Sequence, residues 1–195
     1  MKKNIEVSAL ARVEGEGGLL IRVKNGEICQ VEVNIYEPPR FFEGFLQGRH
    51  FQEVPDITAR ICGICPVAYQ MSSVQALEAA LGVVITPEIR LLRRMLYCAE
   101  YIESHALHVY MLQAPDLLGH ESALSLADDA PEVVQKALRL KKIGNELLKA
   151  IGGRSVHPVN ACVGGFYRWP ELYDIKALIP ELEWARQASL ETVQF

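Results

Sequence analysis

The chain has 195 residues, of which 50% are hydrophobic, and its formal net charge at pH 7 is −4. A chain of this length and apolar content can bury a substantial core, which excludes a disordered protein and fits one domain or a large part of one. Its lysines and arginines are spread along the chain, so we expect no binding to nucleic acid or to an anionic membrane.

The first 38 residues predict a small antiparallel sheet. Strands are expected at residues 5–7, 19–23 and 28–35, and Val31, Val33 and Ile35 alternate at the period of a strand. The pair Asn25-Gly26 separates the last two strands and is typical of a two-residue hairpin. Two prolines at positions 38 and 39 then end the last strand, because proline cannot donate to a ladder.

From residue 39 onward the pattern predicts mainly helix. A short helix is expected at 40–46, and longer helices are expected at 66–81, from 87 to about 115, from 131 to a Gly-Gly stop at 152–153, and at 181–195. The predicted fold class is therefore α+β, mainly α, with a small N-terminal antiparallel sheet (1–38) followed by a long-helix bundle (39–195). Since no repeat or linker divides the chain, residues 1–195 are interpreted as part of a single domain.

The N-terminus indicates a cytoplasmic protein. Lys2 and Lys3 are not followed by an apolar stretch, so the segment is unlike a secretory signal. The apolar run at 79–85 is far shorter than the roughly 20 residues that span a bilayer, so no transmembrane helix is expected. Five cysteines in such a chain favour reduced thiols and metal ligands over a disulfide framework.

The most informative feature is the pair Cys62 and Cys65, which opens the helix predicted at 66–81. By spacing alone, a C-x-x-C pair can be half of a zinc site, a thioredoxin-like redox pair or half of another metal site. Helices rather than a βαβ unit flank this pair, and no second Cys or His pair follows at zinc-site spacing. Arg60 and the helix N-terminus both favour thiolate, which suits metal ligation as well as redox chemistry.

Four segments together carry a resemblance to a known family. Residues 60–65 (RICGIC) resemble the N-terminal nickel-binding motif R-x-C-G-x-C of the large subunit of nickel-iron hydrogenases. Residues 11–15 resemble the family's R-[IV]-E-G element, residues 40–49 its R-G-x-E…G-R element, and residues 152–165 its G-G-[KR]-x-x-H-P…G-G loop. The segments at 37–43 and 65–70 are most similar to the soluble, bidirectional branch linked to NAD(P), including sulfhydrogenase-type alpha subunits.

The resemblance implies a set of cofactor residues. A nickel ion would be held by four thiolates, two from this chain and two from a D-P-C-x-x-C motif near the family's C-terminus. Cys62 would be a terminal nickel ligand, and Cys65 would bridge to an iron that carries cyanide and carbon monoxide, with Arg60 in the same cofactor-binding motif. Glu14 would relay protons and Glu43 would bind magnesium. Without the resemblance, both glutamates would be interpreted as exposed residues.

The implied activity is reversible oxidation of dihydrogen to protons and electrons. The electrons would pass through iron-sulfur clusters of a small partner subunit to NAD(P) or polysulfide, with diaphorase-type subunits as further partners. The chain would be the N-terminal part of the catalytic subunit, and we expect it to be inactive alone, because two thiolates cannot hold the bimetallic centre.

Three alternatives remain open at the level of sequence. The chain could be a truncated, non-catalytic paralogue that binds a partner, or a zinc-stabilised domain in which Cys98 or Cys162 approaches Cys62. It could also be the quinone-site subunit of respiratory complex I, which shares the fold, although the intact Cys62 and Cys65 argue against this.

Several other side chains receive structural interpretations. Tyr69 stands where the family often has histidine; it keeps a donor but cannot become a cation near neutral pH. His105 and His108 share one helical face, and we interpret them as buried and hydrogen-bonded to neighbouring helices rather than as metal ligands. By resemblance, the loop of His157 would face the small subunit. The remaining cysteines are interpreted as buried small hydrophobes; they are Cys29, Cys98 and Cys162.

Overall fold

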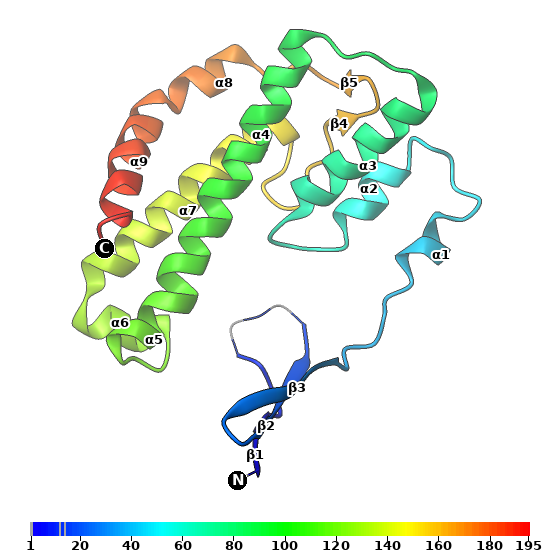
Figure 1. Ribbon diagram of the computed structural model, residues 1–195. Helices are drawn as coiled ribbons and strands as arrows, with labels where there is room; N and C mark the ends of the chain where they lie inside the picture. The colour runs from blue at the N-terminus through cyan, green and yellow to red at the C-terminus, as the bar shows by residue number, and fades with distance from the viewer. Residues whose placement is uncertain (1, 12, 14) are drawn as a thin grey trace. The chain divides into compact units, whose positions relative to one another are not determined.

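The protein is described by a computed structural model that covers residues 2–11, 13 and 15–195, and it divides into two compact units, Met1–Phe41 and Phe42–Phe195 (Figure 1). The first unit is an antiparallel sheet of three strands in the order β1-β2-β3. Its strands are β1 (Lys2–Val7), β2 (Gly17–Lys24) and β3 (Glu27–Ile35). The predicted small N-terminal sheet is therefore confirmed.

The hairpin between β2 and β3 has the predicted geometry. Lys24 pairs with Glu27, so only Asn25 and Gly26 lie in the turn. Their φ angles are 54° and 87°, the left-handed values that a type I′ turn requires at both positions. The alternating residues of β3 are exposed in this unit, including Val31 and Val33.

The second unit is mainly helical. Its helices are α1 (Phe42–Leu46), α2 (Val54–Ala59), α3 (Pro66–Leu81), α4 (Pro87–Ala106), the π-helical segment η1 (Leu107–Gln113), α5 (Ala114–Leu118), α6 (Ala123–Asp129), α7 (Pro131–Gly152), α8 (Leu172–Ala177) and α9 (Ile179–Thr192). The short strands β4 (Ala161–Cys162) and β5 (Gly165–Phe166) form a two-stranded ladder. The long predicted helices are confirmed, whereas α2, α6 and α8 were not predicted. Among the described residues, none of the helices combines the length and apolar character needed to cross a bilayer.

Three long helices form the core of this unit. Proline at the first position of α3, α4 and α7 suits a helix start, since that N–H has no partner within the helix. Left-handed glycines follow α3 and α7, at Gly82 and Gly153. The buried apolar residues that join the three helices and β4 are Val67, Met71, Val74, Leu96, Ala99, Leu147, Leu148, Ile151 and Ala161.

A second cluster lies where α7 packs against η1 and α9. Its buried residues are Ala106, Tyr110, Ala137, Leu140, Ile143, Ala185 and Ala188. The Tyr110 hydroxyl lies 2.7 Å from the Thr192 hydroxyl, which gives this buried ring a polar partner. The C-terminal helix is thus fixed to the long-helix core.

The helices α4 and α7 approach each other closely at Gly144. A Cβ atom at this position would lie 2.8 Å from the carbonyl oxygen of Ala99 and 2.7 Å from the backbone nitrogen of Glu103. Because both atoms belong to the backbone of α4, they cannot move aside without shifting the helix. Gly144 is therefore required by packing.

We expect Gly144→Ala to lower the free energy of unfolding by about 1–3 kcal/mol, the usual cost of overpacking. Urea denaturation followed by circular dichroism measures the change. Gly44→Ala is the matched control, because a Cβ at Gly44 in α1 would have no atom within 4 Å. Equal urea midpoints for the two variants would contradict the close approach of α4 and α7.

Candidate functional site

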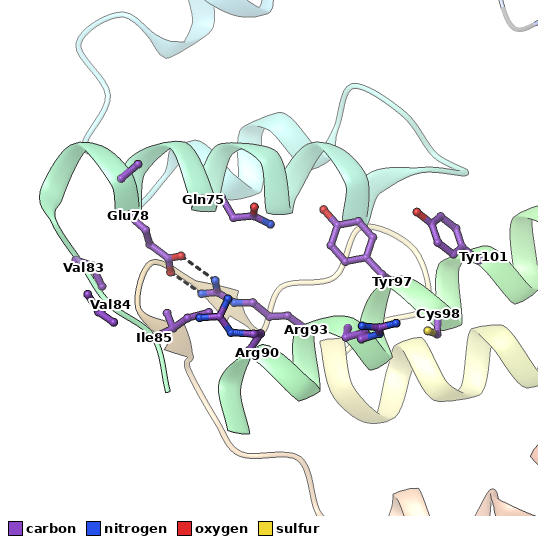
Figure 2. A pocket seen from close by; sticks show the side chains of 12 residues that line it. Gln75, Glu78, Val83, Val84, Ile85, Arg90, Arg93, Tyr97, Cys98 and Tyr101 are labelled. Carbon is purple, nitrogen blue, oxygen red and sulfur yellow. Dashed lines mark hydrogen bonds and ion pairs between the residues drawn. The ribbon is translucent and has the colours of Figure 1, made fainter. Parts of the chain in front are cut away.

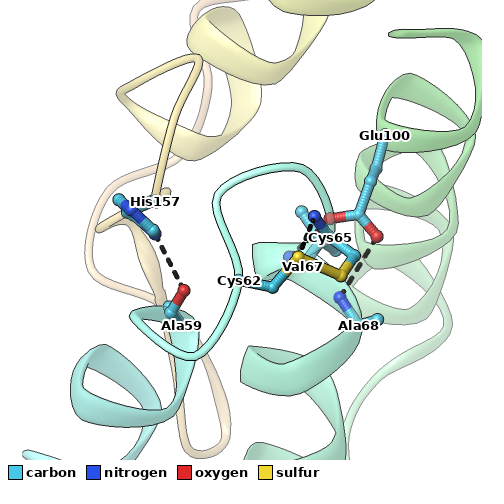
Figure 3. The surroundings of a disulfide bond; sticks show 7 residues. All are labelled: Ala59, Cys62, Cys65, Val67, Ala68, Glu100 and His157. Carbon is cyan, nitrogen blue, oxygen red and sulfur yellow. Dashed lines mark hydrogen bonds between the residues drawn. A yellow bond between two sulfur atoms is a disulfide. The ribbon is translucent and has the colours of Figure 1, made fainter. Parts of the chain in front are cut away.

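The two cysteines of the C-x-x-C motif lie in the turn between α2 and α3 (Figure 3). Cys65 is the residue that precedes the first turn of α3, and its N–H donates to the sulfur of Cys62 at 3.1 Å. Cys62 is 6% exposed, and the Cα atoms of the pair are 5.4 Å apart. Both side chains therefore converge on one side of the turn.

The structure joins the sulfurs of Cys62 and Cys65 in a disulfide, whereas the sequence predicted reduced thiols. The difference has a geometric reason, since the turn directs both sulfurs to one point, where they can bond to each other or to a shared metal. Two converging soft sulfur donors fit half of a four-thiolate nickel site. Within residues 2–11, 13 and 15–195, no cluster of three or more His, Cys, Asp or Glu side chains could hold a metal ion.

A buried carboxylate from α4 lies at the start of α3. Glu100 is 2% exposed and accepts hydrogen bonds from the N–H groups of Val67 (2.6 Å) and Ala68 (3.3 Å). Figure 3 draws these bonds beside the cysteine pair. Burial raises the pKa of the Glu100 carboxyl to about 7, against the opposing effect of the two N–H donors. No motif in the sequence points to Glu100.

The loop after α7 is fixed to the helices beside the cysteines. His157 has a φ of 49°, and its Nδ1 lies 2.8 Å from the carbonyl oxygen of Ala59 at the end of α2. The next residue, Pro158, accepts a hydrogen bond of 2.8 Å from the side-chain amide of Gln70 in α3. The G-G-R-x-x-H-P loop thus contacts both helices that flank the C-x-x-C turn.

A buried ion pair connects the C-terminal part of α3 with α4 (Figure 2). Two guanidinium nitrogens of Arg93 donate to the two oxygens of Glu78, at 2.6 and 2.9 Å. Arg93 also donates to the carbonyl oxygen of Cys162, and the N–H of Gly164 donates to Glu78. Burial alone would raise the pKa of Glu78, but the bonds from Arg93 and Gly164 hold it below its ordinary value. The pair borders a cavity of about 850 Å³.

The structure brings together only part of the predicted site. Arg60 is largely exposed and forms an ion pair with Asp56 at 3.2 Å. Glu43 lies exposed in α1. Glu14 is outside the described residues. The roles predicted for these three side chains, and for Cys62 and Cys65 as nickel ligands, stay predictions.

Four side chains that were predicted to be buried are exposed: His105, His108, Cys29 and Cys98. Each lies on an outward side of its element. The ring of His105 stacks on that of Tyr101 in the same helix, with the ring centroids 5.3 Å apart. Cys162 is half-buried, and Tyr69 is exposed on α3.

The free energy of unfolding should depend on pH through Glu100. The pKa of Glu100 is about 7 in the folded protein, against an ordinary value of 4.5. The folded protein therefore holds this proton more tightly than the unfolded chain, and the resulting stabilisation is complete below pH 4.5 and is lost as pH rises through 7. The full change in the free energy of unfolding is on the order of 3 kcal/mol. Urea denaturation between pH 4.5 and 8 should therefore show a shallower pH dependence for Glu100→Gln than for the wild type. Glu146→Gln, which removes a carboxylate more exposed to solvent, is the control.

The protein is mainly helical, and two converging cysteine sulfurs lie at the N-terminal end of α3. The family model described as nickel-dependent hydrogenase matches residues 40–169. The chain therefore belongs to the nickel-dependent hydrogenase family, as the motifs predicted.

Individual relatives agree with this assignment. Sulfhydrogenase 2 subunit alpha of Pyrococcus furiosus is 41% identical over 174 residues, which are 89% of this chain and 42% of the relative. Sulfhydrogenase 1 subunit alpha of the same organism is 38% identical over 93% of this chain and 42% of its own length. The chain thus spans less than half the length of these relatives.

Solved structures confirm the predicted fold class. A crystal structure of an NAD+-reducing [NiFe]-hydrogenase in the H2-reduced state matches with a TM-score of 0.85 and 29% identity, over 98% of this chain and 45% of that one. The Ni-Fe-Se hydrogenase of Desulfovibrio vulgaris Hildenborough matches with a TM-score of 0.82 and 26% identity, over 99% of this chain and 44% of that one.

Proposed function

We propose that this chain is the N-terminal part of the catalytic large subunit of a cytoplasmic nickel-iron hydrogenase, which oxidises dihydrogen reversibly to protons and electrons. The observation that carries the proposal is the convergence of Cys62 and Cys65 at the head of α3, in a chain of the nickel-dependent hydrogenase family. The names of the similar proteins, two sulfhydrogenase alpha subunits and an NAD+-reducing hydrogenase, support this function.

In this proposal the residues of the chain have distinct tasks. The nickel-iron centre, with cyanide and carbon monoxide on iron, supplies the site at which dihydrogen is split. Cys62 would bind nickel and Cys65 would bind both nickel and iron, because thiolates are soft, basic donors. Arg60 would contribute positive charge near the thiolates, Glu14 would carry protons away, and Glu43 would hold magnesium. The other two thiolates would come from a second C-x-x-C motif.

The proposed partners follow from the electrons that the reaction releases. A small subunit with iron-sulfur clusters would receive them, and diaphorase-type subunits would pass them to NAD(P), or in some relatives to polysulfide. The name of the NAD+-reducing structural relative supports the first acceptor, and the names of the sulfhydrogenase relatives support the second.

Replacing either motif cysteine should remove the metal. In the full-length subunit produced with its small subunit, we expect Cys62→Ser and Cys65→Ser to lose nickel and to reduce a viologen dye with dihydrogen at least 100-fold more slowly, since serine does not replace a thiolate ligand. Elemental analysis measures the nickel. Cys98→Ser is the control, because Cys98 is exposed on α4. Full nickel content in both motif variants would contradict the proposal.

Glu14→Gln tests the proton relay. Because glutamine cannot accept a proton, we expect dihydrogen oxidation to slow by roughly 100-fold or more, while the nickel content stays at the wild-type level. The same dye assay and elemental analysis measure both quantities. Wild-type turnover in this variant would eliminate Glu14 as the relay without touching the assignment of the cysteines.

A second candidate function is partner binding by a truncated, non-catalytic paralogue. The chain spans 42% of the length of its sulfhydrogenase relatives, so the residues encoded beyond Phe195 decide between this function and the first. Sequencing the gene beyond the codon for Phe195 separates the two functions. A second C-x-x-C preceded by Asp-Pro would support the hydrogenase, and a stop codon would support the binding module.

A further inference from the structure

The first turn of α3 contains buried backbone N–H groups that have no hydrogen-bond partner in the side chain of the N-cap residue. Cys65 precedes the helix, yet within the described residues its side chain makes no capping hydrogen bond. Pro66 has no N–H, so the first helical donors that need an acceptor are those of Val67 and Ala68. Val67 is fully buried, so water cannot satisfy its N–H.

Glu100 supplies the acceptor that this turn lacks. Its two carboxyl oxygens accept the Val67 and Ala68 N–H groups separately, from a position more than 30 residues away in the chain. A carboxylate at a helix N-terminus also interacts favourably with the helix dipole. The contact therefore replaces an ordinary side-chain cap with one from another helix.

Glu100 is itself held in a fixed position. Its neighbours Leu96 and Ala99 are fully buried in the core between α3, α4 and α7. One turn further along, Gly144 of α7 leaves room for the backbone of α4 to pack closely. A carboxylate in a fixed position can hold the helical turn that it contacts. Residues next to that turn, here the cysteine pair, are then held in place as well.

We propose that Glu100 is a positioning residue for the cysteine pair, because by holding the Val67 and Ala68 N–H groups it fixes the backbone of Cys65 and the distance between the two sulfurs. The chain of contacts is short: Glu100 holds the first turn of α3, Cys65 precedes that turn, and the Cys65 N–H donates to the Cys62 sulfur. The importance of this position for nickel binding rests on the proposed function. The effect of Glu100 on the distance between the two sulfurs is independent of the proposed function.

The test measures how readily Cys62 and Cys65 pair with each other, without any metal. The 195-residue chain, with Cys29, Cys98 and Cys162 changed to Ser, is equilibrated with glutathione buffers, and mass spectrometry gives the fraction of disulfide. Glu100→Met removes the acceptor, whereas Glu100→Gln keeps an acceptor oxygen without the charge. Glu103→Gln is the matched control, since Glu103 is buried one turn further along α4 and pairs with Lys141.

In Glu100→Met, we expect the equilibrium constant for forming the disulfide to fall at least tenfold, because the two thiols lose their fixed approach. The same equilibrium constant should stay within about threefold of the wild-type value in Glu100→Gln, and it should equal the wild-type value in Glu103→Gln. Equal shifts in the Met and Gln variants would overturn the proposal, since charge rather than position would then be responsible. No shift in Glu100→Met would overturn it as well.

Two further measurements keep the test decisive. If Glu100→Met does not fold, hydrogen exchange of the Val67 amide in Glu100→Gln replaces it, because the one acceptor oxygen of glutamine can still bind this N–H. A Val67 amide protected as in the wild type supports the proposal, and a Val67 amide that exchanges freely beside an unchanged disulfide overturns it. In the full-length subunit, Glu100→Met should lose at least half of its nickel while Glu100→Gln retains it. Nickel absent from the wild type would refute the proposed function alone, because the thiol equilibrium is measured without metal.

Discussion

The position of α3 against α4 depends on two buried carboxylates, one near each end of α3. Near its N-terminal end, Glu100 of α4 accepts the first free N–H groups of α3. Toward its C-terminal end, Glu78 of α3 pairs with Arg93 of α4. The two contacts fix both the antiparallel direction of the helices and their register. A buried charge that loses its partner destabilises a protein by about 3–5 kcal/mol, so this arrangement tolerates little change.

The ion pair also connects the segment after α7 to the C-terminal end of α3. Arg93 reaches the carbonyl oxygen of Cys162, and the N–H of Gly164 reaches Glu78, so β4 and β5 are fixed by the ion pair. On the other side, His157 contacts the end of α2. The loop after α7 therefore contacts both ends of α3, and its contact with α2 helps to hold the cysteine turn between α2 and α3.

Local signals in the sequence were enough to predict the sheet, the long helices and the cysteine pair. Asn25-Gly26 and the prolines at helix starts act through backbone conformation, which is independent of distant contacts. Glu100 and Glu78 were missed because their function depends on partners about 15 to 33 residues away. The available signal was a charged residue within the apolar stripe of a helix. His105 and Cys98 were wrongly predicted as buried, since spacing alone does not give the orientation of a helix.

The proposed site of four thiolates would need both correct sulfur positions and compensation of negative charge, and the described residues contribute unequally to the two. Contacts within residues 42–195 determine the positions of the two sulfurs. The N–H of Cys65 donates to the Cys62 sulfur, and Glu100 accepts from the first turn of α3. Charge compensation is weaker, because Arg60 is already paired with Asp56 and Glu100 adds a carboxylate nearby. Burial raises the pKa of the Glu100 carboxyl to about 7, so a proton can remove its negative charge near neutral pH. A protonated Glu100 keeps a carbonyl oxygen that can accept from the first turn of α3, so this anchor does not require a second negative charge beside the two sulfurs.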